Sequence, residues 1–74
     1  MTFDYSDLTG LIIAKYGSRK EYARAAGMSQ SSLSDKLRGK TPWTTNDMSN
    51  AQKLCGFPPE DIVRYFFTPK VHIL

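Results

Sequence analysis

The side chains best suited to recognition lie in one short stretch, QSSLSDKLR at residues 30–38. Leu33 and Leu37 are spaced to lie one above the other on the inner side of a helix. The side chains that then face outward are Gln30, Ser31, Ser34, Asp35 and Arg38. A helix surface with amide, hydroxyl and guanidinium groups is suited to contact base edges and phosphates in the major groove of DNA.

Asp35 is the residue of this surface that fits DNA least well. A carboxylate can accept a hydrogen bond from cytosine, but elsewhere in a groove it repels the phosphates. Asp35 therefore indicates either narrow sequence specificity or a partner other than DNA.

Residue patterns typical of catalysis or metal binding are absent. The serines at 29, 31, 32 and 34 have no histidine near them in the pattern, so we expect them to cap helices and form hydrogen bonds. Cys55 is the only cysteine and His72 the only histidine; an internal disulfide is excluded, and Cys55 is expected to fill a small apolar space. Phosphate-binding glycine loops and the GxSxG, HExxH and EF-hand patterns do not occur. We expect no enzyme, no cofactor and no metal.

Two short helices joined by a tight turn would present the recognition surface. The first has a capping-box pattern, because Ser18 is followed by Glu21 at the third helical position and each can cap the other's backbone N–H. Its apolar face is formed by Tyr22, Ala23 and Ala26. Gly27 supplies the positive φ angle that ends a helix.

The second helix is expected to begin directly after that turn. Ser29 is placed to cap it, and Gly39 can close it. Ala23 and Gly27 supply the small side chains that two helices crossing near a right angle require. The pattern predicts a helix-turn-helix over about residues 18–39.

The positive charge of the chain is concentrated on this predicted unit. The formal net charge is +3, with −2 on residues 1–14, +5 on residues 15–40 and 0 on residues 41–74. A basic patch centred on the predicted recognition helix suits a polyanion. Arg19, Lys20, Lys36 and Lys40 are expected to contact the phosphate backbone. The alternative is that these cations only solvate short helices.

Three further helices are expected around the central pair. Ser6 is predicted to cap a helix that ends at Gly17, with apolar spacing at Leu8, Leu11, Ile12 and Tyr16. Gly10 lies inside this helix and weakens it. Either a neighbouring helix approaches closely there, or the glycine is merely tolerated. A fourth helix is predicted over about residues 46–55, capped by Thr44 or Thr45 and ended by Gly56. The fifth begins at Pro58-Pro59 and is expected to bury Ile62, Val63, Tyr65 and Phe66.

Two apolar features lie outside these helices. Trp43 follows Pro42 in a loop, where burial is favoured over an exposed contact with a partner. Pro69 stops any helix, so residues 67–74 are predicted to form an extended C-terminal tail that folds back on the core or contacts a partner.

Length and composition define the fold class. A chain of 74 residues, 41% hydrophobic and 23% charged, is typical of one small globular domain, expected over residues 1–74. No apolar stretch is long enough for a membrane helix, and the polar start is not typical of a signal peptide, so we expect no membrane partner and a cytoplasmic location. The predicted fold is all-α, a compact bundle of about five short helices with an extended tail.

The sequence resembles the small helix-turn-helix regulators of phage repressor and Cro type. The matching residues are Ala23, Gly27, the Gln30-Ser31 pair and Leu33, and the stretches FDYSDL, LSDKLRGKTPW and RYFFTPK resemble the Cro-like and modulator-of-repression proteins of temperate phages of Gram-positive bacteria. The resemblance implies a lambda-repressor-like fold. One difference is that many phage repressors bury the residue three positions after the first anchor, where this chain has Lys36 and places Leu37 one position later.

The resemblance implies two alternative roles in the switch between lysogeny and lytic growth in the bacterial host cell. A Cro-like regulator, often a homodimer, would bind double-stranded operator DNA through the second helix of the motif. An antirepressor would use the same face to bind a phage CI-type repressor and block its DNA binding. A helical module without either role remains a third alternative. The residues expected to bind DNA or a repressor are Arg19, Lys20, Gln30, Ser31, Ser34, Asp35, Arg38 and Lys40.

Overall fold

Five α-helices form the part of the chain that the computed structural model describes, residues 3–70. The helices are α1 (Ser6–Tyr16), α2 (Arg19–Ala26), α3 (Gln30–Leu37), α4 (Thr45–Cys55) and α5 (Ile62–Phe66), and the 3-10 turn η1 (Pro59–Asp61) leads into the last of them. Within residues 3–70 there is no strand, only an isolated antiparallel bridge between Phe3 and Pro69. The predicted all-α fold class is therefore confirmed.

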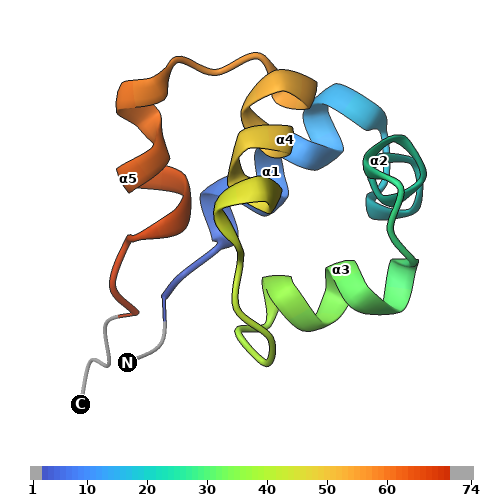
Figure 1. Cartoon of the computed structure of the whole chain (residues 1–74), viewed down its shortest axis with the longest axis horizontal. Coiled ribbons are helices and arrows are strands. Elements are labelled where there is room, and N and C mark those ends of the chain that lie inside the picture. Colours follow the sequence, from blue (N-terminus) through green and yellow to red (C-terminus); the bar gives the residue numbers. More distant parts are fainter. Residues whose placement is uncertain (1–2, 71–74) are drawn as a thin grey trace.

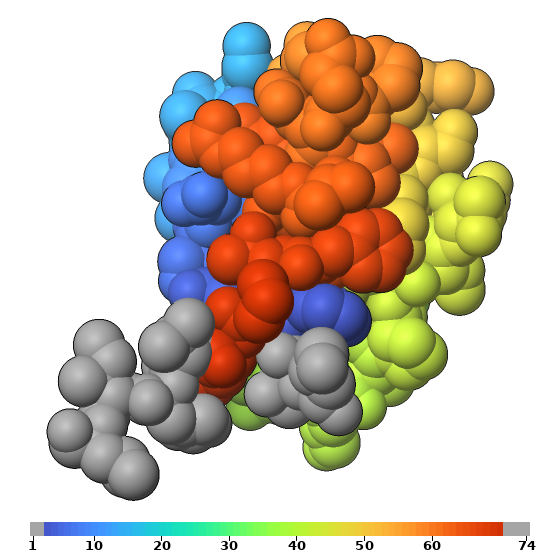
Figure 2. All heavy atoms as spheres, turned by 90° about the vertical axis from the view of Figure 1, so that its left-hand side faces the viewer, coloured from blue at the N-terminus to red at the C-terminus, as the bar shows by residue number. Residues whose placement is uncertain are grey.

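Helix α1 lies at the centre of the bundle and packs against α2, α4 and α5. The pair α2 and α3 lies on one side of α1 and α4, and α5 lies on the other (Figure 1). The face seen in Figure 2 is covered largely by α5, with α1 on one flank and α4 on the other. The recognition helix predicted from the sequence, α3, is therefore at the edge of the bundle, with its outer side open.

The core is a single cluster to which every helix contributes. Its five most deeply buried large side chains are Leu8, Ile12, Tyr22, Leu33 and Phe66, all less than 2% exposed. Trp43 is 7% exposed and its ring stacks edge-on against that of Phe66, with 5.1 Å between the centroids. The predicted burial of Trp43 is confirmed, which removes this side chain as an exposed anchor for a partner.

The predicted ends of the central helices are confirmed by their caps. Ser18 and Ser29 each accept a hydrogen bond from the backbone N–H three residues later, and Gly27 has a φ angle of +71°. The reciprocal capping box predicted for Ser18 and Glu21 is present instead at Thr44 and Asp47, where both hydrogen bonds are formed.

The start of α1 differs from the prediction. Ser6 does not cap this helix but is its first residue. Its backbone N–H and its hydroxyl group both donate to Asp4 Oδ1, over 2.8 and 2.6 Å. Both hydrogen bonds lower the pKa of Asp4, and the one from the Ser6 hydroxyl group has the larger effect. The Asp4 carboxylate accepts from the first N–H of the helix, and the Ser6 hydroxyl group donates to the same carboxylate instead of accepting from an N–H later in α1.

The buried side of α5 also differs from the prediction at one residue. Tyr65 and Phe66 are buried and Ile62 is half-buried, but Val63 is 66% exposed. Residues 62, 65 and 66 lie on one side of a single helical turn, whereas 63 and 67 lie on the opposite side. The prediction for Val63 was wrong because one turn of helix cannot bury both sides.

Neither Gly10 nor Gly27 is required for close packing inside the chain. A Cβ atom at either position would meet no atom within 4 Å. Gly27 is needed for its positive φ angle, so the predicted role in close helix contact was wrong. Gly10 has no positive φ and makes α1 weaker by about 1 kcal/mol than alanine would. The chain itself therefore gives no reason for a glycine at position 10.

The described part of the C-terminal tail runs back along the N-terminal segment. Asp4 N donates to Thr68 O over 2.7 Å, and the rings of Phe3 and Phe67 stack edge-on with 5.5 Å between centroids. The fold-back alternative is thus observed as far as Pro69, which forms a bridge with Phe3. Val71, His72, Ile73 and Leu74 lie outside the described residues.

Tyr22 provides a test of the core, because its hydroxyl group is buried without a hydrogen-bond partner among the described residues. Burial raises the pKa of this phenol. We expect Tyr22→Phe to leave the free energy of unfolding unchanged or to raise it by up to about 1 kcal/mol, since an unsatisfied buried donor is removed. Urea denaturation of the two proteins measures this difference.

The matched control is Tyr16→Phe. The Tyr16 hydroxyl group donates to Leu54 O over 2.7 Å, so its removal should lower the free energy of unfolding by about 1 kcal/mol. A clear loss of stability in Tyr22→Phe would show that the Tyr22 hydroxyl group has a partner such as a buried water.

Candidate partner-binding surface

Helices α2 and α3 are joined by a turn of three residues and cross at a steep angle. Figure 1 shows α2 nearly end-on while α3 runs across the view below it. Met28 in the turn donates its N–H to Ala23 O over 3.0 Å and packs against the core. Leu33, with 0% exposure, fixes α3 to the bundle. This arrangement holds one side of α3 in solvent.

The outer side of α3 carries the residues that the sequence assigned to it. Gln30 and Ser31 in the first turn are exposed, as is Arg38 just after the last helical residue. Ser34 and Asp35 are half-buried rather than fully exposed. The four-residue spacing places 30, 34 and 38 in one row along the helix, with 31 and 35 beside it. These five side chains form one continuous strip, which we call the α3 face.

The only two charges of the α3 face neutralise each other. Arg38 Nη2 donates to Asp35 Oδ1 over 2.6 Å. The Arg38 side chain is 67% exposed, so the pair contributes little to stability. It does change what the surface offers, because the guanidinium group is already bound to a carboxylate before any partner arrives.

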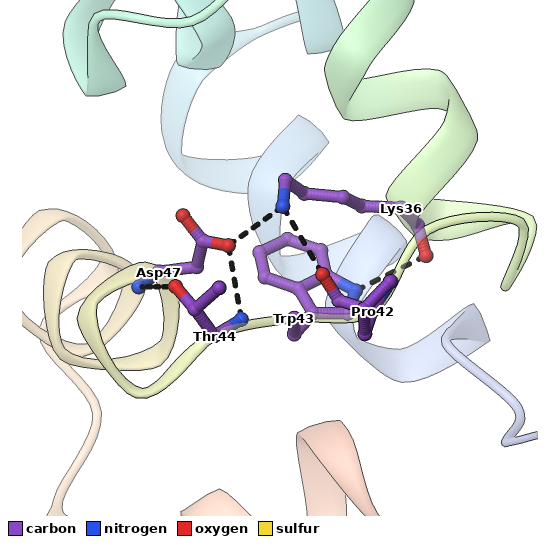
Figure 3. A network of polar contacts seen from close by, with 5 residues as sticks. All are labelled: Lys36, Pro42, Trp43, Thr44 and Asp47. Atoms are coloured by element: carbon purple, nitrogen blue, oxygen red, sulfur yellow. Dashed lines mark hydrogen bonds and ion pairs between the residues drawn. The ribbon is translucent and has the colours of Figure 1, made fainter.

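Lys36 points into the protein and not toward a phosphate backbone (Figure 3). Its Nζ donates to Asp47 Oδ2 over 2.7 Å and to Pro42 O over 3.1 Å. Its own carbonyl oxygen accepts from Trp43 Nε1, over 3.1 Å. Both charged side chains are only 16% exposed. The prediction of a phosphate contact for Lys36 was wrong, because the position three residues after Leu33 faces inward on the helix.

The Lys36–Asp47 pair joins the end of α3 to the start of α4. Burial by itself would raise the pKa of Asp47, but hydrogen bonds from Lys36 and from Thr44 outweigh it and lower that pKa. One carboxylate thus caps α4 and neutralises the ammonium group. Leu37, the next residue of α3, is half-buried beside the pair.

The remaining predicted cations do not gather on the α3 face. Arg19 and Lys20 begin α2, at the end of that helix far from the turn, and Lys40 follows α3 in the loop. All three are exposed and, among the described residues, form no ion pair. The structure therefore brings together the five residues of the α3 face and separates the other three predicted site residues from it.

Comparison with known proteins decides the family. Residues 1–69 match the family described as "Protein of unknown function (DUF739)". The chain belongs to this family. It is also similar, at 39% sequence identity, to the modulator of repression of the temperate bacteriophage TP901-1 from Lactococcus lactis. The alignment with that solution structure covers 97% of each chain, with a TM-score of 0.80.

The resemblance to phage proteins of modulator-of-repression type is thereby confirmed for this DUF739 protein. No match was found among curated proteins. None of the helices described for the DUF739 protein has the length and apolar character that crossing a membrane requires.

Two features of the DUF739 protein's surface were missed in the sequence. The Lys36–Asp47 pair could have been suspected from a lysine at an inward-facing position, but its acceptor lies eleven residues away. Ile13 is 46% exposed, although α1 buries Leu8 and Ile12. The sequence could have indicated the exposure of Ile13, because this residue lies outside the apolar spacing that places Leu8 and Ile12 in the core.

Proposed function

We propose that this protein is an antirepressor of a phage switch, which binds a CI-type phage repressor and blocks its DNA binding. The similarity to a modulator of repression supports this role at the level of the whole chain. At the level of the surface, the supporting observation is that the α3 face carries no free positive charge. This proposal places the protein in the cytoplasm of the bacterial host, where the repressor and its operators are.

The charges of α3 favour a protein partner over DNA. A helix that binds DNA gains most of its affinity from cations that neutralise phosphates. Here the ammonium group of Lys36 is bound to Asp47 inside the protein, and the guanidinium group of Arg38 is bound to Asp35. What remains on the α3 face is an amide and two hydroxyl groups. Such an uncharged polar surface suits hydrogen bonds at a protein interface better than contacts with phosphates.

A repressor's DNA-binding surface must itself be positively charged, and this sets a condition on the interface. Docking it against a strongly basic face would cost free energy through like-charge repulsion. The nearly neutral α3 face avoids that repulsion, and Arg19 and Lys20 lie away from it at the far end of α2. We therefore place the repressor over α3, with its own DNA-binding surface covered.

The experiment is direct titration of the purified protein into the DNA-binding domain of the repressor from the same phage, followed by calorimetry. Gln30→Ala and Arg38→Ala should each weaken binding by about 1 kcal/mol or more, which is roughly fivefold in Kd. Both side chains are exposed, so circular dichroism should show unchanged folding.

Lys53→Ala is the matched control. Lys53 is exposed on α4, and its replacement removes one positive charge without touching α3. Repressor binding should stay within about twofold, since a distant rim charge contributes little. Wild-type affinity in both the Gln30 and the Arg38 variant would remove the α3 face from the mechanism.

Operator DNA is the second candidate partner, and one observation favours it. Arg19, Lys20 and Lys40 are exposed cations on either side of α3 in the chain, and among the described residues they form no ion pair. A Cro-like regulator would use them on phosphates while Gln30 and Ser31 contact bases. Such binding would weaken steeply with salt, by about one logarithmic unit of affinity per logarithmic unit of salt for each phosphate contact.

A further inference from the structure

An open groove of about 800 Å³ lies beside the end of α3. One wall is the exposed side of α1, with Gly10 and Ile13, and another is the end of α3, with Leu37 and Arg38. The N-terminal segment and Thr68–Lys70 complete the lining. Arg38 lines the groove and also belongs to the α3 face, so the groove continues the α3 face around the end of α3.

The polar groups that line the groove are largely satisfied inside the protein. Asp4 Oδ1 accepts from Ser6, and Thr9 Oγ1 donates to Tyr5 O over 2.8 Å. Thr68 Oγ1 donates to Arg64 O. Arg38 and Lys70 add exposed cations to the lining. Between these polar groups the groove offers apolar surface, formed by Ile13 at 46% exposure and by half-buried Leu37.

Gly10 gives the groove its most unusual property. It lies within α1, it is exposed, and a Cβ atom there would meet nothing within 4 Å. Glycine weakens a helix, and neither a positive φ angle nor a close contact inside this chain requires it. Apart from mere tolerance, the physical reason for glycine at such a site is close approach by the backbone of another molecule.

We propose that a helix of the repressor packs in this groove, with its backbone close to Gly10 and its apolar side chains on Ile13 and Leu37. This inference rests on the proposed function, because it extends the same interface past Arg38. A helix fits better than DNA, since the groove offers apolar surface and a place for close backbone contact. The wall on α1 supplies the hydrophobic contacts that the polar α3 face lacks.

The test uses the full chain with a bulky residue placed in the groove. Gly10→Leu should raise the Kd for the repressor's DNA-binding domain at least tenfold, while its melting temperature stays at or above that of the wild type. Ile13→Ser should also raise the Kd, by removing apolar contact. Lys53→Leu places the same side chain at an exposed position of α4 outside the groove lining, and its Kd should stay within twofold.

The outcomes separate the groove from the proposed function. Wild-type affinity in Gly10→Leu would overturn the groove while leaving the α3 face as the repressor site. Absence of repressor binding in the wild type would overturn both proposals. Sedimentation velocity is measured in parallel: a dimer in the wild type that Gly10→Leu converts to a monomer, without loss of repressor binding, would show that a second copy of this chain occupies the groove and would overturn the assignment.

Discussion

Leu33→Ala is expected to lower the free energy of unfolding by about 2–5 kcal/mol. Leu33 is 0% exposed and is the residue through which α3 is fixed to the bundle. Truncation to alanine removes apolar contacts and leaves a cavity that the surrounding helices fill only in part. A domain of this size has a total stability of only about 5–15 kcal/mol, so the loss is a large fraction of the total.

Thermal and urea denaturation followed by circular dichroism measure this loss. Val63→Ala is the control, because Val63 is also a branched apolar residue but is 66% exposed, and its truncation should cost less than about 1 kcal/mol. Equal, small losses in both variants would mean that α3 does not rest on the core through Leu33. The α3 face would then point in another direction.

Asp47→Ala is expected to lower the free energy of unfolding by about 2–4 kcal/mol, through two separate losses. The first is the cap that Asp47 provides to the Thr44 N–H at the start of α4. The second is the anion that neutralises Lys36, whose ammonium group is left mostly buried with Pro42 O as its remaining partner. Urea denaturation at neutral pH measures the sum.

Asp35→Ala is the matched control, since it also removes one carboxylate from an ion pair. The Asp35–Arg38 pair lies at the surface, with the arginine side chain 67% exposed, so the expected loss is below about 1 kcal/mol. A loss in Asp47→Ala no larger than that in Asp35→Ala would show that the Lys36–Asp47 pair does not hold α3 and α4 together.

The lowered pKa of Asp47 also fixes the direction of a pH effect. In the folded protein this carboxyl group holds its proton less tightly than in the unfolded chain, whose ordinary value is 3.8. The stability from the pair is therefore fully present above that value and is lost as the pH falls through the lower folded pKa. Asp47→Asn should reduce the loss of stability between pH 6 and pH 3, and Asp4, whose pKa is also lowered, accounts for part of the rest.

Features set by neighbouring residues could be predicted from the sequence. Ser18, Gly27 and Ser29 determine where α2 ends and α3 begins through hydrogen bonds and φ angles within a few residues. The size of Trp43 in so small a core made its burial predictable. The outward direction of Gln30 and Ser31 followed from the inward direction of Leu33.

Features set by distant residues could not be predicted in this way. The direction of Lys36 depends on Asp47, which belongs to another helix and reaches the same place only in the folded chain. The exposure of Val63 depends on the length of α5, which is short because the 3-10 turn occupies Pro59–Asp61 directly before it. The groove beside Ile13 needs the N-terminal segment and the tail brought together, which spacing along the chain does not show.

Ion pairs within the folded protein also change the functional interpretation. The sequence predicted a basic patch on the helix-turn-helix expected over residues 18–39, and that patch was one reason to consider DNA. In the folded protein Lys36 and Arg38 are bound to Asp47 and Asp35, and Arg24 lies 3.6 Å from Glu21. Three of the seven cations between residues 15 and 40 are thus paired within the chain. The α3 face is left as a polar surface of low charge, suited to a protein partner.

The most direct test of the antirepressor role is fluorescence anisotropy of labelled operator DNA bound by the repressor of the same phage, titrated with this protein. We expect the anisotropy to fall to the value of free DNA as the repressor is released, while this protein alone binds the same DNA weakly and without sequence preference. An unchanged repressor complex, together with tight, salt-sensitive binding of this protein to the operator, would contradict the antirepressor role and establish a Cro-like regulator.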